Sequence, residues 1–311
     1  MRRRLPALLS LLAVCGVLAV LPFLLSDYNV SLAARVGIYF IAVLGLNVLT
    51  GYTGQISIGH GAFMAVGGYT TAVMSRDHHT SLILTMLLAL AICFVLGLLV
   101  GLPALRLSGV YLALATFALA VSVPQLPLKW SKFLGGRDGV QTSRTVSHAW
   151  LYGAAWTASA ILFVLAWLIL RGRVGRAFRA VRDSEIAAVA SGIELPVYKT
   201  LAFGISAAYA GVAGSLFVLA TNGFAAPDEF GVVLSLQLLV GAAVAGLGSL
   251  WGVLAGAVFV GLLPTVSSSV PVIGSNHGRD VVFGAAVVLV MLLLPGGFAG
   301  LLARLRRSAG A

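Results

Sequence analysis

The chain has 311 residues, of which 60% are hydrophobic and 9% are charged, and its formal net charge at pH 7 is +11. Soluble domains carry about 25% charged residues, so the composition excludes an ordinary soluble fold. Apolar runs of about 17–25 residues recur along the chain, which is the length needed to cross a bilayer. Basic residues lie at the ends of these runs and in loops, a distribution that disfavours a nucleic-acid-binding surface. We predict an all-α, polytopic membrane helix bundle embedded in the lipid bilayer.

The first apolar run follows three arginines and extends over residues 5–25. It is longer than the apolar core of a secretory signal peptide, which is about 7–15 residues. No small-x-small cleavage site closes it before Asp27. We therefore predict a retained first span. Cys15 and Cys93 both fall inside apolar segments, and we expect them to act as small hydrophobic residues rather than as metal ligands or a disulfide.

About ten transmembrane helices are predicted in all, and this number places both termini on one side together with the loop 171–199. That side then holds thirteen of the twenty Lys and Arg residues, and the other side holds seven. Basic residues accumulate on the cytoplasmic side of membrane proteins. We therefore predict a multi-pass protein of the plasma membrane with both termini in the cytoplasm. The spans after the first are predicted at 34–50, 61–75, 81–105, 109–127, 150–170, 200–221, 231–247, 249–264 and 280–295.

A glycine-rich segment with polar side chains, GYTGQISIGHGAFMAVGGY, occupies residues 51–69. Irregular backbone inside a membrane must be buried in protein or border a cavity, and broken helices with polar side chains often mark a transport pathway. A cytoplasmic turn followed by a tightly packed helix is the other interpretation, and both stay open. His60 alone is more typical of a hydrogen-bonded structural histidine than of a proton relay. The candidate pathway residues are Gly54, Gln55, Ser57, Gly59 and His60.

Glycines recur every four residues at Gly97 and Gly101, and again at Gly248, Gly252 and Gly256. Four residues make about one helical turn, so these glycines line one helix face and permit close helix contact. We predict close packing within one bundle, with a seam between two subunits as the alternative.

The longest strongly polar segment lies between two apolar spans at residues 171–199 and carries six of the twenty Lys and Arg residues. Asp183 or Ser184 can cap a short helix there. Three of the candidate residues then fall at i, i+3 and i+7, near one helix face, where small side chains allow a partner to approach closely. We interpret the segment as a cytoplasmic docking surface, with an amphipathic helix on the lipid headgroups as the alternative. The candidate docking residues are Glu185, Ala187, Ala188 and Gly192.

Common catalytic motifs do not occur in the sequence, which contains no Gly-x-x-x-x-Gly-Lys-Ser/Thr, His-Glu-x-x-His or Gly-x-Ser-x-Gly. Ionisable residues inside the predicted spans are sparse, which disfavours a carboxylate-based ion exchanger. We predict no catalytic residues, no metal site and no cofactor bound by this chain. Energy for any transport would have to come from another subunit.

Four ordered segments, followed by a closing LPGGFAGLL, resemble the membrane permease subunit of a branched-chain amino acid ABC importer, closest to its M-type subunit. They extend over roughly residues 46–302. In chain order they are LNVLTGYTGQISIGHGAFMAVGGY, VYLALATFALA with the later LGGRDGV, GRAFRAVRDSEIAAVASGIELPVYKTLAFGISA, and LVGAAVAGLGSLWGVLAGA.

The resemblance implies a single transmembrane permease domain over residues 1–311 that imports branched-chain or similar hydrophobic amino acids. It implies four kinds of partner: a second, H-type permease, two cytoplasmic ABC ATPases that bind the ATP, an extracytoplasmic binding protein and the small-molecule solute. It also places ATPase coupling on Glu185, Ala187, Ala188 and Gly192, although the family pattern has Glu directly before two alanines and Ile186 intervenes here. The alternatives are an ABC permease for urea, short amides or another small solute, and a secondary transporter or channel that needs no ATPase.

Overall fold

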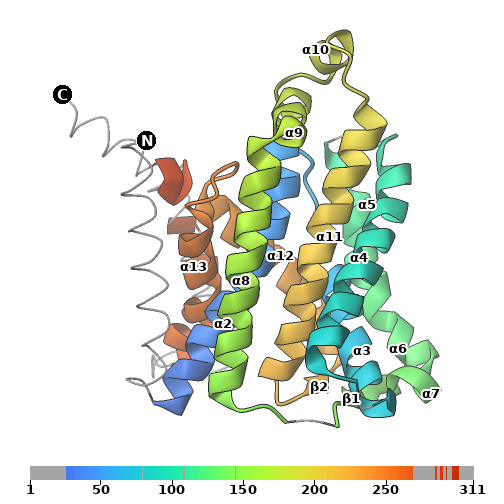
Figure 1. Cartoon of the computed structure of the whole chain (residues 1–311), viewed down its shortest axis with the longest axis vertical. Helices are drawn as coiled ribbons and strands as arrows, with labels where there is room; N and C mark the ends of the chain where they lie inside the picture. The colour runs from blue at the N-terminus through green and yellow to red at the C-terminus, as the bar shows by residue number, and fades with distance from the viewer. Residues whose placement is uncertain are drawn as a thin grey trace, which may run out of the picture.

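The structure, a computed structural model, describes residues 26–78, 80–107, 109–143, 145–268, 284–285, 288–289, 292 and 296–300. Helices make up most of this part of the chain, so the predicted all-α bundle is confirmed (Figure 1). The only sheet among the described residues is an antiparallel pairing of two short strands, β1 (Val140–Gln141) and β2 (Phe224–Ala225).

The long helices match the predicted spans between residues 34 and 264. Six helical stretches among the described residues are long and apolar enough to cross a membrane, and α3 and α13 are not among those six. The predicted span 5–25, most of the span 280–295 and both termini lie outside the described residues, so the count of ten is not confirmed. The long helices are α2 (Asp27–Leu46), α3 (His60–His78), α4 (Leu82–Ala104), α5 (Val110–Ser122), α8 (His148–Arg171), α11 (Leu195–Ala220), α12 (Val232–Ala245) and α13 (Val253–Ser268).

Short elements gather at the two ends of the bundle. At the top of Figure 1 lie α9 (Arg173–Asp183) and α10 (Glu185–Ala190), and we call this the α10 end. The opposite end holds the strands with α6 (Leu126–Lys129) and α7 (Ser131–Leu134), and we call it the strand end. The remaining short helices are η1 (Asn47–Tyr52), a π-helix that continues α2, and the 3-10 turns η2 (Val123–Gln125), η3 (Gly136–Asp138) and η4 (Pro227–Phe230).

Helix α11 lies at the centre of the bundle and packs against α4, α3 and α2. Small residues permit these close contacts, because a Cβ at Gly97 of α4 would lie 2.6 Å from the Ala207 Cβ of α11. Cys93 is fully buried beside Gly211, and its thiol donates a weak hydrogen bond to the Phe63 carbonyl at 3.4 Å. The predicted close packing is therefore confirmed for Gly97 and Gly101, and so is the small-residue role of Cys93, whereas Cys15 lies outside the described residues. The prediction that Gly248, Gly252 and Gly256 line one helix face is wrong, because Gly248 and Gly252 lie in the loop before α13 and Gly248 has φ +81°.

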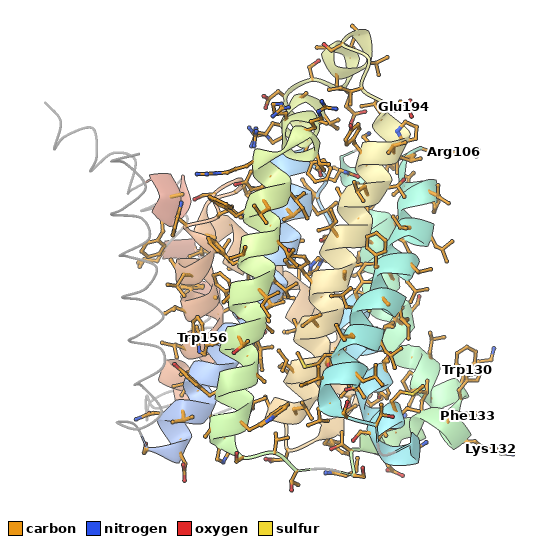
Figure 2. The ribbon with its side chains drawn as sticks, viewed as in Figure 1. Arg106, Trp130, Lys132, Phe133, Trp156 and Glu194 are labelled. Atoms are coloured by element: carbon orange, nitrogen blue, oxygen red, sulfur yellow. The ribbon has the colours of Figure 1, made fainter. Side chains whose placement is uncertain are left out.

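Polar side chains join α2 to α8 within the apolar part of the bundle. The Trp156 indole N–H donates to the Ala33 carbonyl at 3.2 Å, and the Ser159 hydroxyl donates to the Gly37 carbonyl at 3.0 Å (Figure 2). Hydrogen bonds of this kind hold helices together where lipid removes most of the hydrophobic driving force.

Candidate functional site

The chain between η1 and α3 is not helical and runs through the bundle as residues 53–59. Its N-terminal part lies at the α10 end, where Gly54 packs against Arg182 of α9. Farther along, the Ile58 N–H donates to the Thr116 hydroxyl in the middle of α5 at 2.9 Å, and the Gly61 N–H donates to the Ser235 hydroxyl of α12 at 2.9 Å. The segment therefore enters the bundle at membrane depth, which favours the broken-helix interpretation over the cytoplasmic turn.

Local hydroxyl groups satisfy part of the backbone that this break leaves free. The Thr50 hydroxyl donates to the Gln55 carbonyl at 3.1 Å, and the Thr53 hydroxyl donates to the Leu49 carbonyl at 2.5 Å. Threonine and serine side chains commonly replace lost helical hydrogen bonds in this way. The polar residues of the sequence therefore have a structural role at the start of the break.

Two glycines allow the segment to pass close to its neighbours. Gly54 has φ +72°, in the left-handed region that glycine adopts without strain. A Cβ at Gly59 would lie 2.9 Å from the Thr116 carbonyl oxygen, so any larger residue would push the segment away from α5. The close approach of backbone to α5 thus depends on glycine.

The five candidate pathway residues lie in one short stretch, and three of them carry polar side chains that point inward. Gln55, Ser57 and His60 are all buried. Gln55 Oε1 and both ring nitrogens of His60 have no hydrogen-bond partner among the residues that the structure describes. The prediction of a hydrogen-bonded structural histidine is therefore wrong for this part of the chain. Buried polar atoms without partners are rare, so this cluster has spare capacity to bind water or solute.

The predicted cap of the docking helix is confirmed at Ser184. Its Oγ accepts a hydrogen bond from the Ala187 N–H at 3.3 Å, which satisfies one of the free amides at the start of α10. The helix is short because Gly192, with φ +79°, follows its last turn, and the Ile193 N–H returns to the Ala188 carbonyl at 3.0 Å. The prediction that Gly192 lies on one face with Glu185 and Ala188 is therefore wrong, since Gly192 ends the helix.

The small residue that was expected to meet a partner faces the protein itself. Ala188 is 2% exposed, and Glu185 Oε1 lies 2.6 Å from the Nζ atom of Lys199, a buried residue on α11. The outward surface of α10 carries Ile186, which is 86% exposed, and Val189, which is 55% exposed. The sequence signal for this surface was a pair of apolar residues, Ile186 and Val189, spaced at i and i+3 in a polar loop. The coupling prediction did not use this signal.

Arg182 is a functional candidate that sequence reasoning missed. Its Nη1 donates to the Gly51 carbonyl of η1 at 3.0 Å, and its Nε donates to Asp183 at 3.2 Å. The stem of Arg182 packs against Gly54, and its guanidinium lies against Gly248 in the loop between α12 and α13. Arg182 therefore joins the end of α9, two residues before the α10 cap Ser184, to the start of the helix break.

Asn47, the first residue of η1, binds the same loop between α12 and α13 that Arg182 contacts. Its side-chain amide donates to the Ser249 carbonyl and accepts from the Gly248 N–H, both at 2.9 Å. Three segments that are far apart in sequence therefore meet at one point of the α10 end. We call this point the Arg182 junction and define it as Arg182, Asn47, Gly51, Gly54 and Gly248.

The chain was compared with known families and proteins. Residues 28–293 match the family described as "Branched-chain amino acid transport system / permease component". The permease protein LivM of Salmonella typhimurium is 31% identical over 93% of this chain and 74% of its own length, and that of Escherichia coli K12 is equally similar.

Two other permeases are also similar. LivH of Escherichia coli K12 is 24% identical over 84% of this chain and 91% of its own length. The autoinducer 2 import system permease LsrC of an Enterobacter species is 30% identical over 85% of this chain and 79% of its own length. No solved structure was found to match. Because the family match covers most of its length, the chain belongs to the permease-component family of branched-chain amino acid transport systems.

Proposed function

We propose that this chain is a membrane permease subunit of an ATP-driven ABC importer that moves branched-chain or similar hydrophobic amino acids into the cytoplasm. The names of the LivM and LivH relatives support the solute class. The observation that carries the proposal is the Arg182 junction, because it joins the end of α9, next to the short exposed helix α10, to a broken helix with unpartnered polar groups.

The proposed coupling begins on the outward surface of α10. An ATPase subunit docks on Ile186 and Val189, with the exposed Ala187 between them. The pair of Glu185 with Lys199 and the edge-to-face contact of Phe178 with Tyr198, at 6.4 Å between ring centroids, tie α10 and α9 to α11. A displacement of α10 by the ATPase subunit is therefore transmitted to α11 through these contacts. Ala188 supports the helix from within and Gly192 fixes its length, so both act on coupling indirectly.

ATP is bound and hydrolysed by two separate ATPase subunits in this proposal, and this chain binds no cofactor. It forms one permease domain over its whole length. The chain contributes a conformational change and no catalytic step. Arg182 transmits the displacement of α9 to Gly51, and the segment 53–59 changes its position between α5 and α12.

The solute route passes the polar stretch from Gly54 to His60. Gln55, Ser57 and His60 provide weak polar contacts to a passing amino acid, and Gly54 and Gly59 give the backbone the close path it needs. An extracytoplasmic binding protein selects and delivers the solute. The low number of polar groups suits a route that must release what it binds.

The glycine at position 59 provides a test of this route. Gly59→Ala should lower amino acid uptake per inserted complex, because the added Cβ would lie 2.9 Å from the Thr116 carbonyl and displace the segment. Gly153→Ala on α8 is the matched control, since nothing lies within 4 Å of a Cβ there. Uptake would be measured in vesicles with the amount of assembled complex determined by immunoblot. Equal uptake by the two variants would remove this segment from the route.

A second permease subunit, of the H type, completes the proposed membrane part. Support comes from the paired names LivM and LivH, which denote two permease proteins of one transport system in Escherichia coli. Both relatives align with most of this chain, so the partner is expected to share its fold.

The α10 end faces the cytoplasm in this proposal, with both termini on the same side. Among the described residues, seven basic side chains lie at the α10 end and five lie toward the strand end, which supports this orientation. The seven are Arg106, Arg171, Arg173, Arg176, Arg179, Arg182 and Lys199, and the five are Arg35, Arg76, Lys129, Lys132 and Arg137.

Cysteine labelling tests the orientation. Glu194 and Lys132 lie at opposite ends of the bundle and both are exposed (Figure 2). In intact cells, an impermeant maleimide should label Lys132→Cys, whereas Glu194→Cys should react only after the membrane is opened. The reverse pattern would place α10 outside the cell and exclude its contact with an ATPase.

Reconstitution decides the function itself. This chain would be assembled in liposomes with the second permease, the two ATPases and the binding protein, and leucine uptake would be measured with and without ATP. ATP-dependent uptake of leucine supports the proposal, and uptake by the chain alone would indicate a secondary transporter or channel. The similarity to LsrC makes another small solute the second candidate, so autoinducer 2, urea and short amides belong in the same assay.

A further inference from the structure

A groove opens between α4 and α8 on the face of the bundle that Figure 1 shows, in the half nearer the strand end. Its volume is about 560 Å³, and Val212 of α11 forms part of its floor. Helix α4 packs against α11, whereas α8 packs chiefly against α2, so the two helices stand apart over α11. None of the described helices fills the space between them.

Apolar side chains line this groove almost completely. Helix α4 contributes Leu87 and Leu90, and α8 contributes Ala154 and Ala158. No charged side chain lies among the lining residues, and Thr157 provides their only hydroxyl group. A buried water needs about two to four polar partners, and a zwitterionic amino acid needs partners for both of its charges. The groove therefore suits an apolar occupant and suits neither water nor the proposed solute.

The position of the groove along α8 corresponds to one leaflet of a bilayer. Trp150, in the first turn of α8, lies at one end of the groove and is 38% exposed, and Leu162 lies at the other end. Tryptophan residues of membrane proteins gather at the interface between lipid and water. A rise of about 1.5 Å per residue puts Leu162 about 18 Å from Trp150 along the helix, and the hydrocarbon core is about 30 Å thick. The groove therefore extends from the interface to about the middle of the bilayer.

The opposite end of α8 indicates the same depth. The guanidinium of Arg171, the last residue of α8, lies over the Trp167 ring at 3.9 Å from its centroid. A tryptophan beside an arginine at the end of a span is typical of a membrane interface. The helical rise puts Trp150 and Trp167 about 26 Å apart, close to the thickness of the hydrocarbon core, about 30 Å. Helix α8 therefore crosses the bilayer with Trp150 at one interface and Trp167 at the other.

The cross-section of the groove distinguishes between the apolar occupants that a membrane offers. A volume of about 560 Å³ over a length of about 18 Å gives a mean cross-section of about 31 Å². A transmembrane helix with its side chains is about 10 Å or more in diameter, which corresponds to at least about 79 Å². A second helix therefore does not fit, whereas a single hydrocarbon chain does.

We propose that this groove binds one acyl chain of a phospholipid from the leaflet at the strand end. The chain lies on α11 between α4 and α8, and the headgroup lies beside Trp150. Lipid chains are as apolar as the lining side chains, so the hydrophobic effect gives no preference for the groove over the bulk lipid. Contact with three helices retains the chain instead, because an empty groove would leave its lining atoms without neighbours. The site therefore recognises the chain and not the headgroup.

Photolabelling of the reconstituted complex tests the site in the wild-type protein. The probe is phosphatidylcholine with a diazirine at the middle of one acyl chain, in liposomes of phosphatidylethanolamine and phosphatidylglycerol, and mass spectrometry locates the labelled residues. Val212 is the diagnostic residue, because it is 4% exposed and only a chain inside the groove reaches it. Labelling at Val212 is expected, with an equal yield from a phosphatidylglycerol probe. Labelling confined to outward-facing residues such as Leu168, which is 54% exposed, would overturn the proposal.

Two variants of α8 provide a matched comparison. Thr157→Phe places a ring inside the groove, and Ala160→Phe places the same ring on the same helix outside it. Both positions are exposed, so both variants should insert and assemble. Thr157→Phe should lower the labelling of Val212 severalfold, and native mass spectrometry should find one phospholipid fewer bound to it than to Ala160→Phe. Equal labelling and equal lipid counts would contradict a site in the groove, whichever solute the complex transports.

Discussion

Replacing Arg182 with methionine is expected to leave an assembled complex that hydrolyses ATP but takes up roughly tenfold less amino acid per ATP. Methionine keeps an apolar stem beside Gly54 and removes the donor that binds the Gly51 carbonyl at 3.0 Å. A hydrogen bond to a charged group contributes about 1.5–3 kcal/mol, and about 1.4 kcal/mol corresponds to a factor of ten. Without this bond, a displacement of α9 no longer reaches the start of the helix break.

Arg176→Met is the matched control for this prediction. Arg176 lies on the same helix and is exposed, and its guanidinium makes no hydrogen bond or ion pair with another described residue. The substitution Arg176→Met therefore removes one positive charge, as Arg182→Met does, and leaves the contacts of the Arg182 junction in place. Uptake and ATP hydrolysis would be measured on the same reconstituted complexes. An equal loss of coupling in both variants would show that charge at the α10 end matters and that the contact with Gly51 does not.

Val189→Asp is expected to weaken the association of the ATPase subunits by roughly tenfold or more. Burial of a valine or isoleucine side chain contributes about 1.5–3 kcal/mol, and a carboxylate in its place would lose this contribution and lose solvation as well. Val189 is exposed on α10, so the substitution removes little from the fold of the chain itself. Ile186→Asp should have the larger effect, because Ile186 is 86% exposed and Val189 is 55% exposed.

Val197→Asp is the control for the docking surface. Val197 is 53% exposed, close to the value for Val189, but it lies on α11 outside the short helix. Co-purification of the ATPases with each tagged permease variant measures the association. Full retention of the ATPases by Ile186→Asp and Val189→Asp would exclude α10 as their docking site, whatever the transport activity.

The spans were predictable because the bilayer requires a certain length and an apolar composition of every transmembrane helix, and both can be read from the sequence of that segment alone. Helices α4, α8 and α11 coincide with predicted spans to within a few residues. The helix break was only partly predictable. Its glycines and polar residues indicated irregular backbone, but the fit of Gly59 to the Thr116 carbonyl depends on α5, more than fifty residues later.

The docking helix shows where local periodicity fails. The prediction placed Gly192 on one face with Glu185 because it assumed that the helix continued for two turns. The left-handed φ of Gly192 instead ends the helix. The direction in which Glu185 points follows from Lys199, fourteen residues away on another helix. The contact of Arg182 with Gly51 joins residues 131 positions apart, and no local pattern contains that information.

The π-helix η1 has a geometric consequence for the break that follows it. A π-turn closes its hydrogen bonds over five residues and an α-turn over four, so η1 holds more chain per turn than the α2 helix that it continues. Conversion of η1 to α-geometry would release one residue toward the segment 53–59 and rotate the following backbone by about 100°, since an α-helix has about 3.6 residues per turn. The directions in which Gln55, Ile56 and Ser57 point would then change. Arg182 binds the carbonyl of Gly51 inside this π-turn, and the guanidinium therefore helps to hold η1 in the geometry from which the segment 53–59 departs.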